Sequence, residues 1–345
     1  MSPTVSVHSA PDAQEAWRHV ADAYPHARLA HAVEWLGVIA RAYGHDPLYL
    51  SADDGGRCCG LLPAFLVRRP LFGAVVASMP FLDSGGPCAS PAAARLLIDR
   101  LIAEARRRGA RFVELRTAEP LAIDVEPLQH KVNMTLALDR QPDVLWRGFD
   151  KTVRNQIRKA ERSGLSIETA GAAALPAFYE AFAERMRDLG SPVHGIGFLR
   201  AVFDAFGPRA RLVLLKKDAT LVGGLVAIAF KDRIAVPWAA CRKAFFALCP
   251  NMLLYWDTIR TACLQGFSRF EFGRSTRKSG TYEFKRQWGA IEEPIYWYRI
   301  ALSAQSPRPH PSDTQPAATL ARMWQRLPLP VTRQLGPRLR KYLIQ

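Results

Sequence analysis

The cationic segment from Arg269 to Ala290 holds the side chains best suited to chemistry in this sequence. Its first part, Phe270-Glu271-Phe272-Gly273, alternates as a short strand that ends at a glycine, and a cationic loop and an aromatic, basic stretch follow. A strand that brings several cations and a glycine loop to one place can cradle an anion or a developing negative charge. Charges that merely solvate a hairpin explain the composition equally well.

Acyl transfer to an amine is a reaction that these side chains could support. The amine supplies the nucleophile, so the protein has only to position it and to stabilise the oxyanion that develops. We predict that Lys285, or a main-chain amide of residues 275–281, stabilises this oxyanion. Glu271, Glu283 and Asp83 are the candidate carboxylates for accepting the proton of the amine.

A second cationic feature is the predicted helix at 151–162. Lys151, Arg154, Arg158 and Arg162 recur at steps of three and four residues, which places them on one helical face. A row of cations that is not interleaved with acids suits the phosphate groups of a ligand. The alternative is a solvated helix face without a ligand.

Other catalytic signatures are absent from the sequence, which has no G-x-S-x-G elbow, Walker loop, H-E-x-x-H motif or dinucleotide fingerprint. Its six cysteines form no C-x-x-C pair, which disfavours a zinc site and a disulfide framework, so we predict free thiols and no metal. His194 lies on a predicted loop. It is either a base or, as is commoner for a lone loop histidine, a structural residue.

Length and charge bound the remaining possibilities. The 345 residues, 49% of them hydrophobic, predict two domains or one large domain with a substantial core. No apolar run approaches the roughly 20 residues of a membrane span, and the first residues do not read as a secretory signal, so we predict a cytoplasmic protein. The formal charge of +16 predicts an anionic partner: nucleic acid, a phosphorylated substrate or an anionic membrane.

The elements that must position these residues occur twice along the chain. In the first half we predict helices within 1–46, strands at 47–51, 59–67 and 73–79, a loop at 83–87, a helix at 92–108, and strands at 111–116 and 132–138. In the second half we predict helices at 142–149, 151–163, 175–189, 197–206 and 251–265, and strands at 165–168, 211–216, 221–230, 233–238, 270–272 and 294–300.

Matching residues at constant spacing indicate that this order is a duplication. The pairs are Trp35-Leu36 with Phe198-Leu199, Tyr43-Gly44 with Phe206-Gly207, Gly60 with Gly223, and, after the next helix, Arg111–Thr117 with Arg269–Ser275. Only the second copy carries the cationic glycine loop. We therefore predict that the first copy is a degenerate partner that shapes a cleft, and that the chemistry belongs to the second copy.

The composition changes at 306, where a proline-rich linker begins. The tail at 320–345 mixes apolar and basic residues and contains no acid, a pattern typical of a segment that lies on an anionic membrane surface. A tail that packs on the body of the protein, or that stays disordered, is the alternative, because Pro328, Pro330 and Pro337 interrupt any long helix.

Several motifs in one order resemble the FemAB-like transferases, and most closely those associated with exosortase and exopolysaccharide loci. The resemblance covers residues from about 73 to the C-terminus, and its motifs are Lys-Thr-Val-Arg-Asn-Gln-Ile-Arg-Lys-Ala-Glu-Arg-Ser-Gly (151–164), Leu-Gly-Ser-Pro-Val (189–193), Asn-Met-Leu-Leu-Tyr-Trp (251–256), Phe-Gly-Arg-Ser (272–275), Gly-Thr-Tyr-Glu-Phe-Lys-Arg-Gln-Trp-Gly (280–289), and the Trp-Gln-Arg-Leu-Pro-Leu-Pro and Leu-Gly-Pro of the tail. It implies an α/β fold of two tandem GNAT-like domains, each a mixed twisted sheet flanked by helices. We place these domains at 1–140 and 141–303, with the linker and basic tail at 304–345.

The resemblance also implies roles for particular residues. Lys285 occupies the lysine position of the Phe-Lys-x-x-aromatic-Gly motif, which the family uses in transfer, and Arg274, Arg154 and Arg158 match the arginines that hold phosphates. The other predicted substrate-binding residues are Lys151, Asn251, Tyr255, Ser275, Tyr282, Phe284, Trp288 and Asp83. The chain departs from the family in lacking the long coiled-coil arm of some members and in having Glu271 where the subgroup has aspartate.

FemAB proteins transfer amino acids from aminoacyl-tRNA to the amine of a peptidoglycan precursor. The resemblance thus implies an acyl or aminoacyl transferase that acts on an amine or hydroxyl of a cell-envelope or polysaccharide precursor, without a permanently bound cofactor and in the cytoplasm, peripheral to the inner face of the cytoplasmic membrane. An acyl-CoA-dependent GNAT enzyme is one alternative, although its (Gln/Arg)-x-x-Gly-x-(Gly/Ala) loop is missing. A non-catalytic nucleic-acid-binding protein and a membrane-associated structural component of a polysaccharide assembly are the others.

Overall fold

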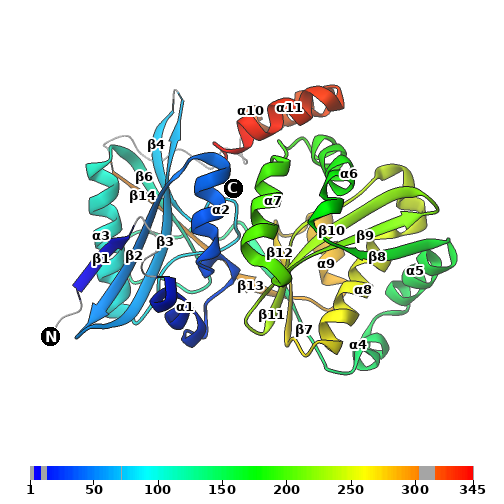
Figure 1. Cartoon of the computed structure of the whole chain (residues 1–345), viewed down its shortest axis with the longest axis horizontal. Helices are drawn as coiled ribbons and strands as arrows, with labels where there is room; N and C mark the ends of the chain where they lie inside the picture. Colours follow the sequence, from blue (N-terminus) through cyan, green and yellow to red (C-terminus); the bar gives the residue numbers. More distant parts are fainter. Residues whose placement is uncertain (1–3, 9–13, 71, 303–314, 345) are drawn as a thin grey trace. The chain divides into compact units, whose positions relative to one another are not determined.

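The computed structural model describes residues 4–8, 14–70, 72–302 and 315–344 of the chain (Figure 1). Within them the chain forms two compact units. The first consists of Met1–Lys131, Pro294–Pro309 and Lys341–Gln345, and the second of Val132–Glu293 and His310–Arg340. This division differs from the predicted domain ranges because segments that are distant in sequence join each unit. The predicted linker at 306–311 lies outside the described residues.

The sheet of the first unit has the strand order β1-β2-β3-β4-β6-β14, and β5 pairs with β3. The pairs are antiparallel except β4 with β6, which run parallel because a helix, α3, carries the chain back between them. The elements are β1 (Thr4–His8), α1 (Gln14–Ala23), the 3₁₀ helix η2 (Leu29–His31), α2 (Glu34–Tyr43), β2 (Asp46–Asp54), β3 (Arg57–Arg69), β4 (Gly73–Ser78), β5 (Cys88–Ala89), α3 (Pro91–Arg107), β6 (Ala110–Thr117) and β14 (Tyr296–Ala301).

The core of the first unit lies between its sheet and α3. Ser90 caps this helix, since its side chain accepts the Ala93 N–H at 3.4 Å, and Pro91 occupies the first turn, where its missing N–H costs nothing. The apolar stripe of α3 meets buried residues of β2, β3 and β6. The buried members of the stripe are Ala93, Leu97, Ile98, Leu101 and Ala105.

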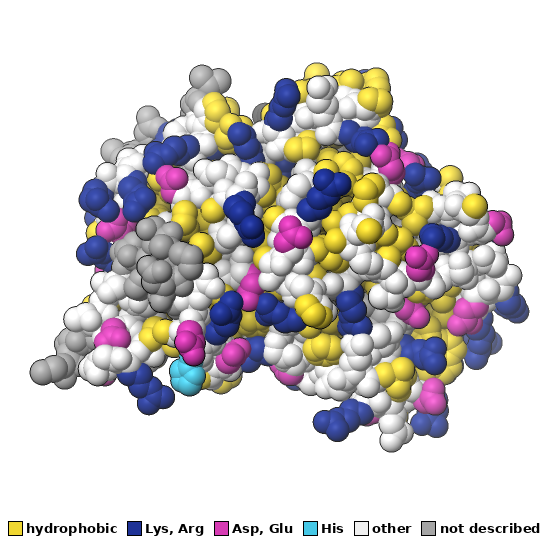
Figure 2. Space-filling view, in the orientation of Figure 1, with side chains coloured by type: hydrophobic (Ala, Val, Ile, Leu, Met, Phe, Trp, Pro, Cys, Tyr) yellow, Lys and Arg dark blue, Asp and Glu magenta, His cyan; other side chains and the backbone are white. Residues whose placement is uncertain are grey.

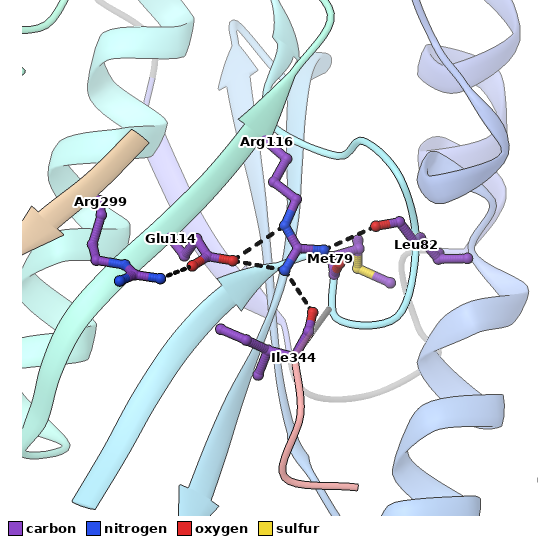
Figure 3. A network of polar contacts seen from close by, with 6 residues as sticks. All are labelled: Met79, Leu82, Glu114, Arg116, Arg299 and Ile344. Atoms are coloured by element: carbon purple, nitrogen blue, oxygen red, sulfur yellow. Dashed lines mark hydrogen bonds and ion pairs between the residues drawn. The ribbon is translucent and has the colours of Figure 1, made fainter. Parts of the chain in front are cut away.

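A fully buried arginine ties the end of the chain to the first unit (Figure 3). Arg116 is 1% exposed and donates to the Glu114 carboxylate at 2.6 Å and to the carbonyl oxygen of Ile344 at 2.5 Å. Arg299 of β14 pairs with the other oxygen of Glu114 at 2.8 Å. Burial alone would raise the pKa of Glu114, but the two arginines outweigh it and lower this pKa to about 2. Arg116 also donates to the carbonyl oxygens of Met79 and Leu82.

The sheet of the second unit has the same arrangement, with the order β13-β7-β12-β11-β10-β9-β8 and a parallel pair, β11 with β12, joined through helix α8. The elements before the tail are β7 (Val132–Ala137), α4 (Pro142–Gly148), α5 (Lys151–Arg162), β8 (Leu165–Ala170), η3 (Ala172–Ala174), α6 (Leu175–Asp188), α7 (Ile196–Phe206), η4 (Gly207–Arg209), β9 (Ala210–Lys217), β10 (Thr220–Phe230), β11 (Arg233–Cys241), η5 (Lys243–Leu248), α8 (Pro250–Leu264), β12 (Arg269–Ser275), α9 (Gly280–Arg286) and β13 (Ile291–Pro294). The tail adds α10 (Gln315–Gln325) and α11 (Leu329–Arg340).

Helices cover both faces of the second sheet (Figure 1). On one face, Val213 and Leu215 of β9 join the buried residues of α5 and α8 in a single apolar cluster. On the other, Leu214 and Gly224 lie against Phe178 of α6. Residues that alternate along a strand point to opposite faces, so this strand is buried on both.

The two units confirm the predicted fold of two mixed sheets flanked by helices, and β6 and β12 occupy the same place in their sheets, as the match of Arg111–Thr117 with Arg269–Ser275 predicts. One strand of the predicted first domain, 1–140, joins the second unit. The strand at 132–138 follows β6 in sequence but pairs with β12 as β7, whereas β14, after the second copy, pairs with β6. Each sheet therefore includes one strand that follows the other copy in the sequence: β14 follows the second copy and joins the first sheet, and β7 follows the first copy and joins the second sheet.

Some elements differ from the sequence prediction. Thr4–His8 was expected to be helical, but it alternates polar and apolar residues and pairs with β2 as strand β1. The stretch that begins at Gly280 was treated as a loop. It forms α9, because the Ser279 side chain accepts the Tyr282 N–H at 3.3 Å and so caps the helix.

The tail packs on the second unit through one side of its two helices. Arg333 of α11 pairs with Glu180 of α6 at 2.7 Å, and the Gln325 amide donates to the carbonyl oxygen of Asp188 at 3.1 Å. Pro328 lies between α10 and α11, Pro330 lies in the first turn of α11, where a proline is tolerated, and Pro337 lies inside α11. On the side that carries these contacts, the tail therefore packs on the body of the protein.

Glycines allow the tail to approach closely. A Cβ at Gly336 would lie 3.0 Å from the Val193 side chain, and a Cβ at Gly190, where φ is +71°, would lie 2.8 Å from Cβ of Ala321. Both contacts exclude a side chain at the glycine. Two of the family-like motifs therefore pack against each other, because Gly336 of Leu-Gly-Pro contacts Val193 of Leu-Gly-Ser-Pro-Val.

Candidate functional site

The candidate site lies at the carboxyl end of β12. The parallel pairing of β11 with β12 covers only Arg233–Ala235 with Arg269–Glu271 in the described register, so the later residues of both strands diverge. Helix α8 starts after β11 and α9 starts after β12, beside this opening. In open α/β sheets, ligands bind outside the carboxyl ends of parallel strands at such a point.

Lys285 points from α9 back to the end of β12. Its ammonium donates to the carbonyl oxygens of Gly273 at 2.8 Å and Arg274 at 2.9 Å, and the residue is only 8% exposed. These carbonyls fix the position of the ammonium. The arrangement places a cation where negative charge on a ligand or transition state would be stabilised.

An aromatic cluster holds α9 on the sheet. Tyr255 of α8 stacks on Phe272 of β12 at 5.5 Å between ring centroids and meets Phe284 edge-on at 5.2 Å. Trp288, 1% exposed, packs edge-on against Phe149 at 5.3 Å. Burial raises the pKa of Tyr255, so its hydroxyl stays protonated. The structure thus brings the predicted substrate residues Tyr255, Phe284 and Trp288 together, and their contacts are those of a core that positions Lys285.

Several buried polar atoms near this point have no hydrogen-bond partner among the described residues. Ser275, the last residue of β12, is 4% exposed and its hydroxyl is one of them. Asn133 Oδ1 and Thr135 Oγ1 on the neighbouring strand β7, and Nε1 of Trp288, are others. Buried polar groups in native proteins are nearly always satisfied by protein, ordered water or ligand, so these atoms mark positions where a water or a ligand would supply the missing bonds; Asn133 and Thr135 lie on the face of the sheet opposite the apolar cluster that contains Trp288.

Asn133 and Thr135 were missed by the sequence prediction. They alternate with Val132, Met134 and Leu136, which are buried in the apolar cluster, so they lie on the opposite face of β7. The pattern was visible in the sequence, because two polar residues alternate with three apolar ones. What could not be seen is that this strand pairs with β12, opposite Glu271 and Arg274.

Glu271 is held in a buried ion pair. Its carboxylate accepts from Arg233 at 2.9 Å, and a second carboxylate, that of Glu293, lies 3.9 Å from the same guanidinium. Glu283 pairs with Arg286 at 2.7 Å on the exposed side of α9. The carboxylates that were candidates for accepting a proton on this part of the chain are thus both engaged by arginines.

The remaining predicted site residues have separate environments. The Tyr282 hydroxyl donates to Glu292 at 2.6 Å, and this hydrogen bond raises the pKa of Tyr282 and lowers that of Glu292. Arg274 is half-buried at the end of β12, and Asn251 is half-buried in the first turn of α8. Asp83 belongs to the first unit, between β4 and β5, and is not placed with the others in the second unit.

The cationic row of α5 is present as predicted. Val153, Ile157 and Ala160 are buried in the core, which turns Lys151, Arg154, Arg158 and Arg162 away from it. None of these four pairs with a carboxylate in the described part of the chain; the Arg158 guanidinium lies over the Trp146 ring at 5.4 Å and Arg154 donates to the carbonyl oxygen of Arg147. Phe149, just before α5, packs on Trp288, so the helix begins next to α9.

His194 is a structural residue. It is 1% exposed, stacks on Phe198 at 4.5 Å between centroids, and accepts a hydrogen bond from Nε of Arg340 at 3.1 Å. Burial and then the neighbouring guanidinium lower its pKa well below the ordinary value. Its neutral ring helps to pack α11 against the loop before α7.

The first unit has a cavity of about 510 Å³ at the place that corresponds to the end of β12. Thr117 at the end of β6, Ser90 before α3, and the loop around Glu119 line it, together with the buried His31 and Arg28. No motif in the sequence predicts this cavity in the copy that lacks the cationic loop. Burial lowers the pKa of His31 to about 4, so its ring is neutral near pH 7.

No metal site is found among the described residues, where no group of three or more His, Cys, Asp or Glu side chains could hold an ion. All six cysteines are free thiols, of which Cys59 is exposed and Cys88, Cys241 and Cys263 are buried. None of the described helices combines the length and the apolar character that a membrane crossing requires.

Comparison with known proteins identifies the fold. Residues 147–286 match the family model described as acetyltransferase (GNAT) domain. No curated protein matches the sequence. Three solved structures share the fold over most of the chain. FemX has a TM-score of 0.70 at 14% identity and covers 86% of this chain and 97% of its own.

The other two are more distant. The C-terminal domain of a putative lysylphosphatidylglycerol synthetase from Agrobacterium fabrum has a TM-score of 0.56 at 11% identity, over 84% of this chain and 92% of its own. A tandem GNAT protein from the clavulanic acid biosynthesis pathway has a TM-score of 0.54 at 13% identity, over 88% and 100%. These likenesses confirm the predicted fold of two tandem GNAT-like domains, and the segment that matches the GNAT family model lies within the second unit.

Proposed function

We propose that this protein transfers an acyl or aminoacyl group onto an amine or hydroxyl, and that the reaction takes place at the carboxyl end of β12. The observation that carries the proposal is the ammonium of Lys285, held between the carbonyl oxygens of Gly273 and Arg274, while the hydroxyl of the next residue, Ser275, is buried without a partner among the described residues. The match of residues 147–286 to the GNAT domain supports the reaction class.

The transfer needs no nucleophile from the protein. The amine nitrogen of the acceptor attacks the acyl carbonyl carbon, a C–N bond forms, and the carbonyl electron pair moves onto oxygen. Lys285 and the Ser275 hydroxyl stabilise this oxyanion. The intermediate then collapses, the bond from carbon to the donor's oxygen or sulfur breaks, and the proton of the amine departs with that atom.

Glu271 has a positioning role in this proposal. The carboxylate of Glu271 pairs with Arg233, and this ion pair ties β12 to the start of β11. We therefore do not assign it the catalytic role that the sequence motif suggested. Arg274 and Asn251, half-buried at the two edges of the opening, are our candidates for contacts with substrate.

Aminoacyl-tRNA is the donor that we propose. The unpaired cationic row of α5 suits a polyphosphate backbone, and it begins beside α9. The proposed acceptor is a cell-envelope precursor. The fold relative named as a putative lysylphosphatidylglycerol synthetase supports an aminoacyl transfer of this kind. An acyl-CoA donor is the alternative, which the match to an acetyltransferase domain favours.

Donor consumption tests the proposal. The full chain is incubated separately with aminoacyl-tRNA and with acyl-CoA, each with peptidoglycan-precursor peptides and amino sugars as acceptors, and the acylated product is measured. We expect Lys285→Ala to lower kcat by about 10²- to 10³-fold, as for loss of an oxyanion-stabilising group. Lys216→Ala, which removes a lysine that is 37% exposed in an ion pair with Glu168, is the matched control and should not change the rate.

Either of two results would contradict the proposal: no donor is consumed with any acceptor, or Lys285→Ala retains full activity. A non-catalytic nucleic-acid-binding protein is the second candidate, and the α5 row is the observation that favours it. It predicts that the protein binds RNA that carries no aminoacyl group, that the affinity falls steeply with salt, and that Lys285→Ala leaves the affinity unchanged.

A further inference from the structure

The tail helices α10 and α11 have two different faces. The inner face packs on the second unit through Thr332 and Gly336, which are buried, and through the ion pair of Arg333 with Glu180. Trp324 of α10 lies on the same side and is 9% exposed. These contacts fix which side chains of the tail point outward.

The exposed side of the tail carries an apolar row. Val331, Leu335 and Leu339 follow one another at four-residue steps along α11, and they are 36%, 38% and 45% exposed. Leu320 and Met323 of α10 are 65% and 61% exposed. A helix that has already buried one face has no structural need for large apolar residues on the other, and contiguous apolar surface of this kind marks an interaction site.

Cations border this apolar row. Arg322, Arg326 and Arg338 are exposed, and no ion pair joins them to a carboxylate within the described ranges. The sequence from 315 to 345 contains no acid, so nothing in the segment itself neutralises them. Figure 2 shows hydrophobic and basic side chains next to each other over α10 and α11, at the top of the view.

We propose that the outer face of α10 and α11 docks on an anionic membrane surface. A row of large apolar side chains flanked by arginines is the pattern of a helix that lies in the plane of the interface, with the apolar side chains among the acyl chains and the guanidinium groups at the headgroup phosphates. The 11 and 12 residues of the two helices extend only about 17 Å each, too short to cross a hydrocarbon core of roughly 30 Å.

Charge complementarity selects the lipid surface over other occupants. A second copy of this chain, with a formal charge of +16, would bring the same arginines together around the apolar row. RNA would satisfy the arginines but would leave Leu335 and Leu339 in water. An anionic bilayer satisfies both groups. This inference does not depend on the proposed transfer reaction.

Vesicle co-sedimentation of the full chain tests the inference, with vesicles of phosphatidylcholine alone and of phosphatidylcholine with phosphatidylglycerol. We expect binding to the anionic vesicles only, weakened by salt. The double variant Leu335→Gln/Leu339→Gln and the triple variant Arg322→Gln/Arg326→Gln/Arg338→Gln should each lower the affinity about tenfold or more. Leu264→Gln, at a leucine of α8 that is more exposed (65%) than Leu335 and Leu339, and Arg106→Gln on α3 are the controls and should bind as the wild type does.

Three results would overturn the proposal. They are equal binding to neutral vesicles, unchanged binding of the double variant, and sedimentation of the wild type without vesicles that the double variant abolishes, which would show self-association. The substituted residues are exposed, so the thermal unfolding of the variants should match that of the wild type; this measurement separates loss of binding from loss of folding. The assay contains neither donor nor acceptor, so its result is independent of catalysis.

Discussion

The ammonium of Lys285 donates a 2.9 Å hydrogen bond to the carbonyl oxygen of Arg274, near the end of β12. At the corresponding place in the first unit, the carbonyl oxygen of Arg116 accepts the main-chain N–H of Gly85 at 2.7 Å. The same backbone acceptor is thus satisfied by a cation in one unit and by a neutral amide in the other. A charged donor stabilises developing negative charge more strongly than an amide does. This difference is the physical ground for placing the proposed reaction in the second unit.

Ser275→Ala should separate stability from activity. Its hydroxyl is buried without a partner among the described residues, so its removal should leave the free energy of unfolding unchanged or raise it by up to about 1 kcal/mol. Transfer should fall at least about tenfold if the hydroxyl contacts the oxyanion. Urea unfolding and steady-state rates measure the two quantities.

The contrasting variant is Ser279→Ala, which removes the cap of α9 and should destabilise by about 1 kcal/mol. A Ser275→Ala variant that loses stability but keeps its rate would show that this hydroxyl is structural.

Arg116→Met should destabilise the first unit by about 3–5 kcal/mol, because it leaves the buried Glu114 carboxylate with Arg299 as its remaining arginine and removes the donor to the Ile344 carbonyl. Urea unfolding monitored by tryptophan fluorescence measures the loss. Arg111→Met, at an exposed arginine of the same strand, should change stability by no more than about 0.5 kcal/mol. Equal losses of unfolding free energy in the two variants would show that the polar network in Figure 3 does not stabilise the first unit more than an exposed arginine does.

Acid should weaken the first unit through His31. Its pKa is about 4 in the folded protein against an ordinary value of 6.5, so the unfolded chain binds the extra proton first. The stabilisation is complete above about pH 6.5 and is lost as the pH falls toward 4, by about 3 kcal/mol in total. His45, in the same unit, shifts in the same direction and adds to the loss, and His194 acts likewise in the second unit.

The His31→Gln variant isolates this contribution. An amide can replace the ring, which accepts from the Arg28 N–H at 2.9 Å and contacts the carbonyl oxygen of Gly86 at 3.2 Å. Its unfolding free energy should vary less across this pH range than that of the wild type. Parallel pH curves for the two proteins would mean that the neutral state of His31 does not matter for stability.

Gly336→Ala and Gly190→Ala should loosen the tail. The new Cβ would lie 3.0 Å from Val193 in the first case and 2.8 Å from Ala321 in the second, so each should cost about 1–3 kcal/mol and speed tryptic cleavage at Arg322 and Arg326. Gly197→Ala is the control, because nothing lies within 4 Å of a Cβ there and alanine favours the helix α7 by about 0.5–1 kcal/mol. Unchanged proteolysis in Gly336→Ala would show that the joint tolerates a side chain.

Arg154→Gln and Arg158→Gln should reduce the salt dependence of tRNA binding. Each phosphate contact that is lost lowers the slope of log affinity against log salt by about 1. Arg200→Gln, at an exposed arginine of α7, should leave the slope unchanged. Filter binding over a series of salt concentrations measures it. Identical slopes for all the proteins would exclude the α5 row from nucleic-acid contact.

Much of the fold follows from the sequence. Periodicities of two and of three to four residues predict most strands and helices, because they report which face of an element is buried. The constant spacing between Arg111–Thr117 and Arg269–Ser275 predicts that β6 and β12 occupy equivalent places. The same motif reading pointed to Lys285 as the centre of the site, and the structure buries that residue at the end of β12.

The pairing of distant segments could not be predicted from such patterns. Periodicity shows that a strand has an apolar face but not which strand lies beside it, so the exchange by which β7 joins β12 and β14 joins β6 appears only in the folded chain. For the same reason Asn133 and Thr135 were not predicted as site residues, because the sequence does not show that their strand, β7, pairs with β12.

By itself the sequence predicted the duplication, most element types and the cationic face of α5, and it pointed to Lys285 as the candidate lysine. The tertiary structure alone decided what those residues touch. It pairs Glu271 with Arg233, turns Tyr255, Phe284 and Trp288 into the core that holds α9, assigns Asp83 to the first unit, and divides the tail into a packed and an exposed face. The physical reason is that local propensity and periodicity act over neighbouring residues, whereas partners and burial arise from contacts between residues far apart in the chain.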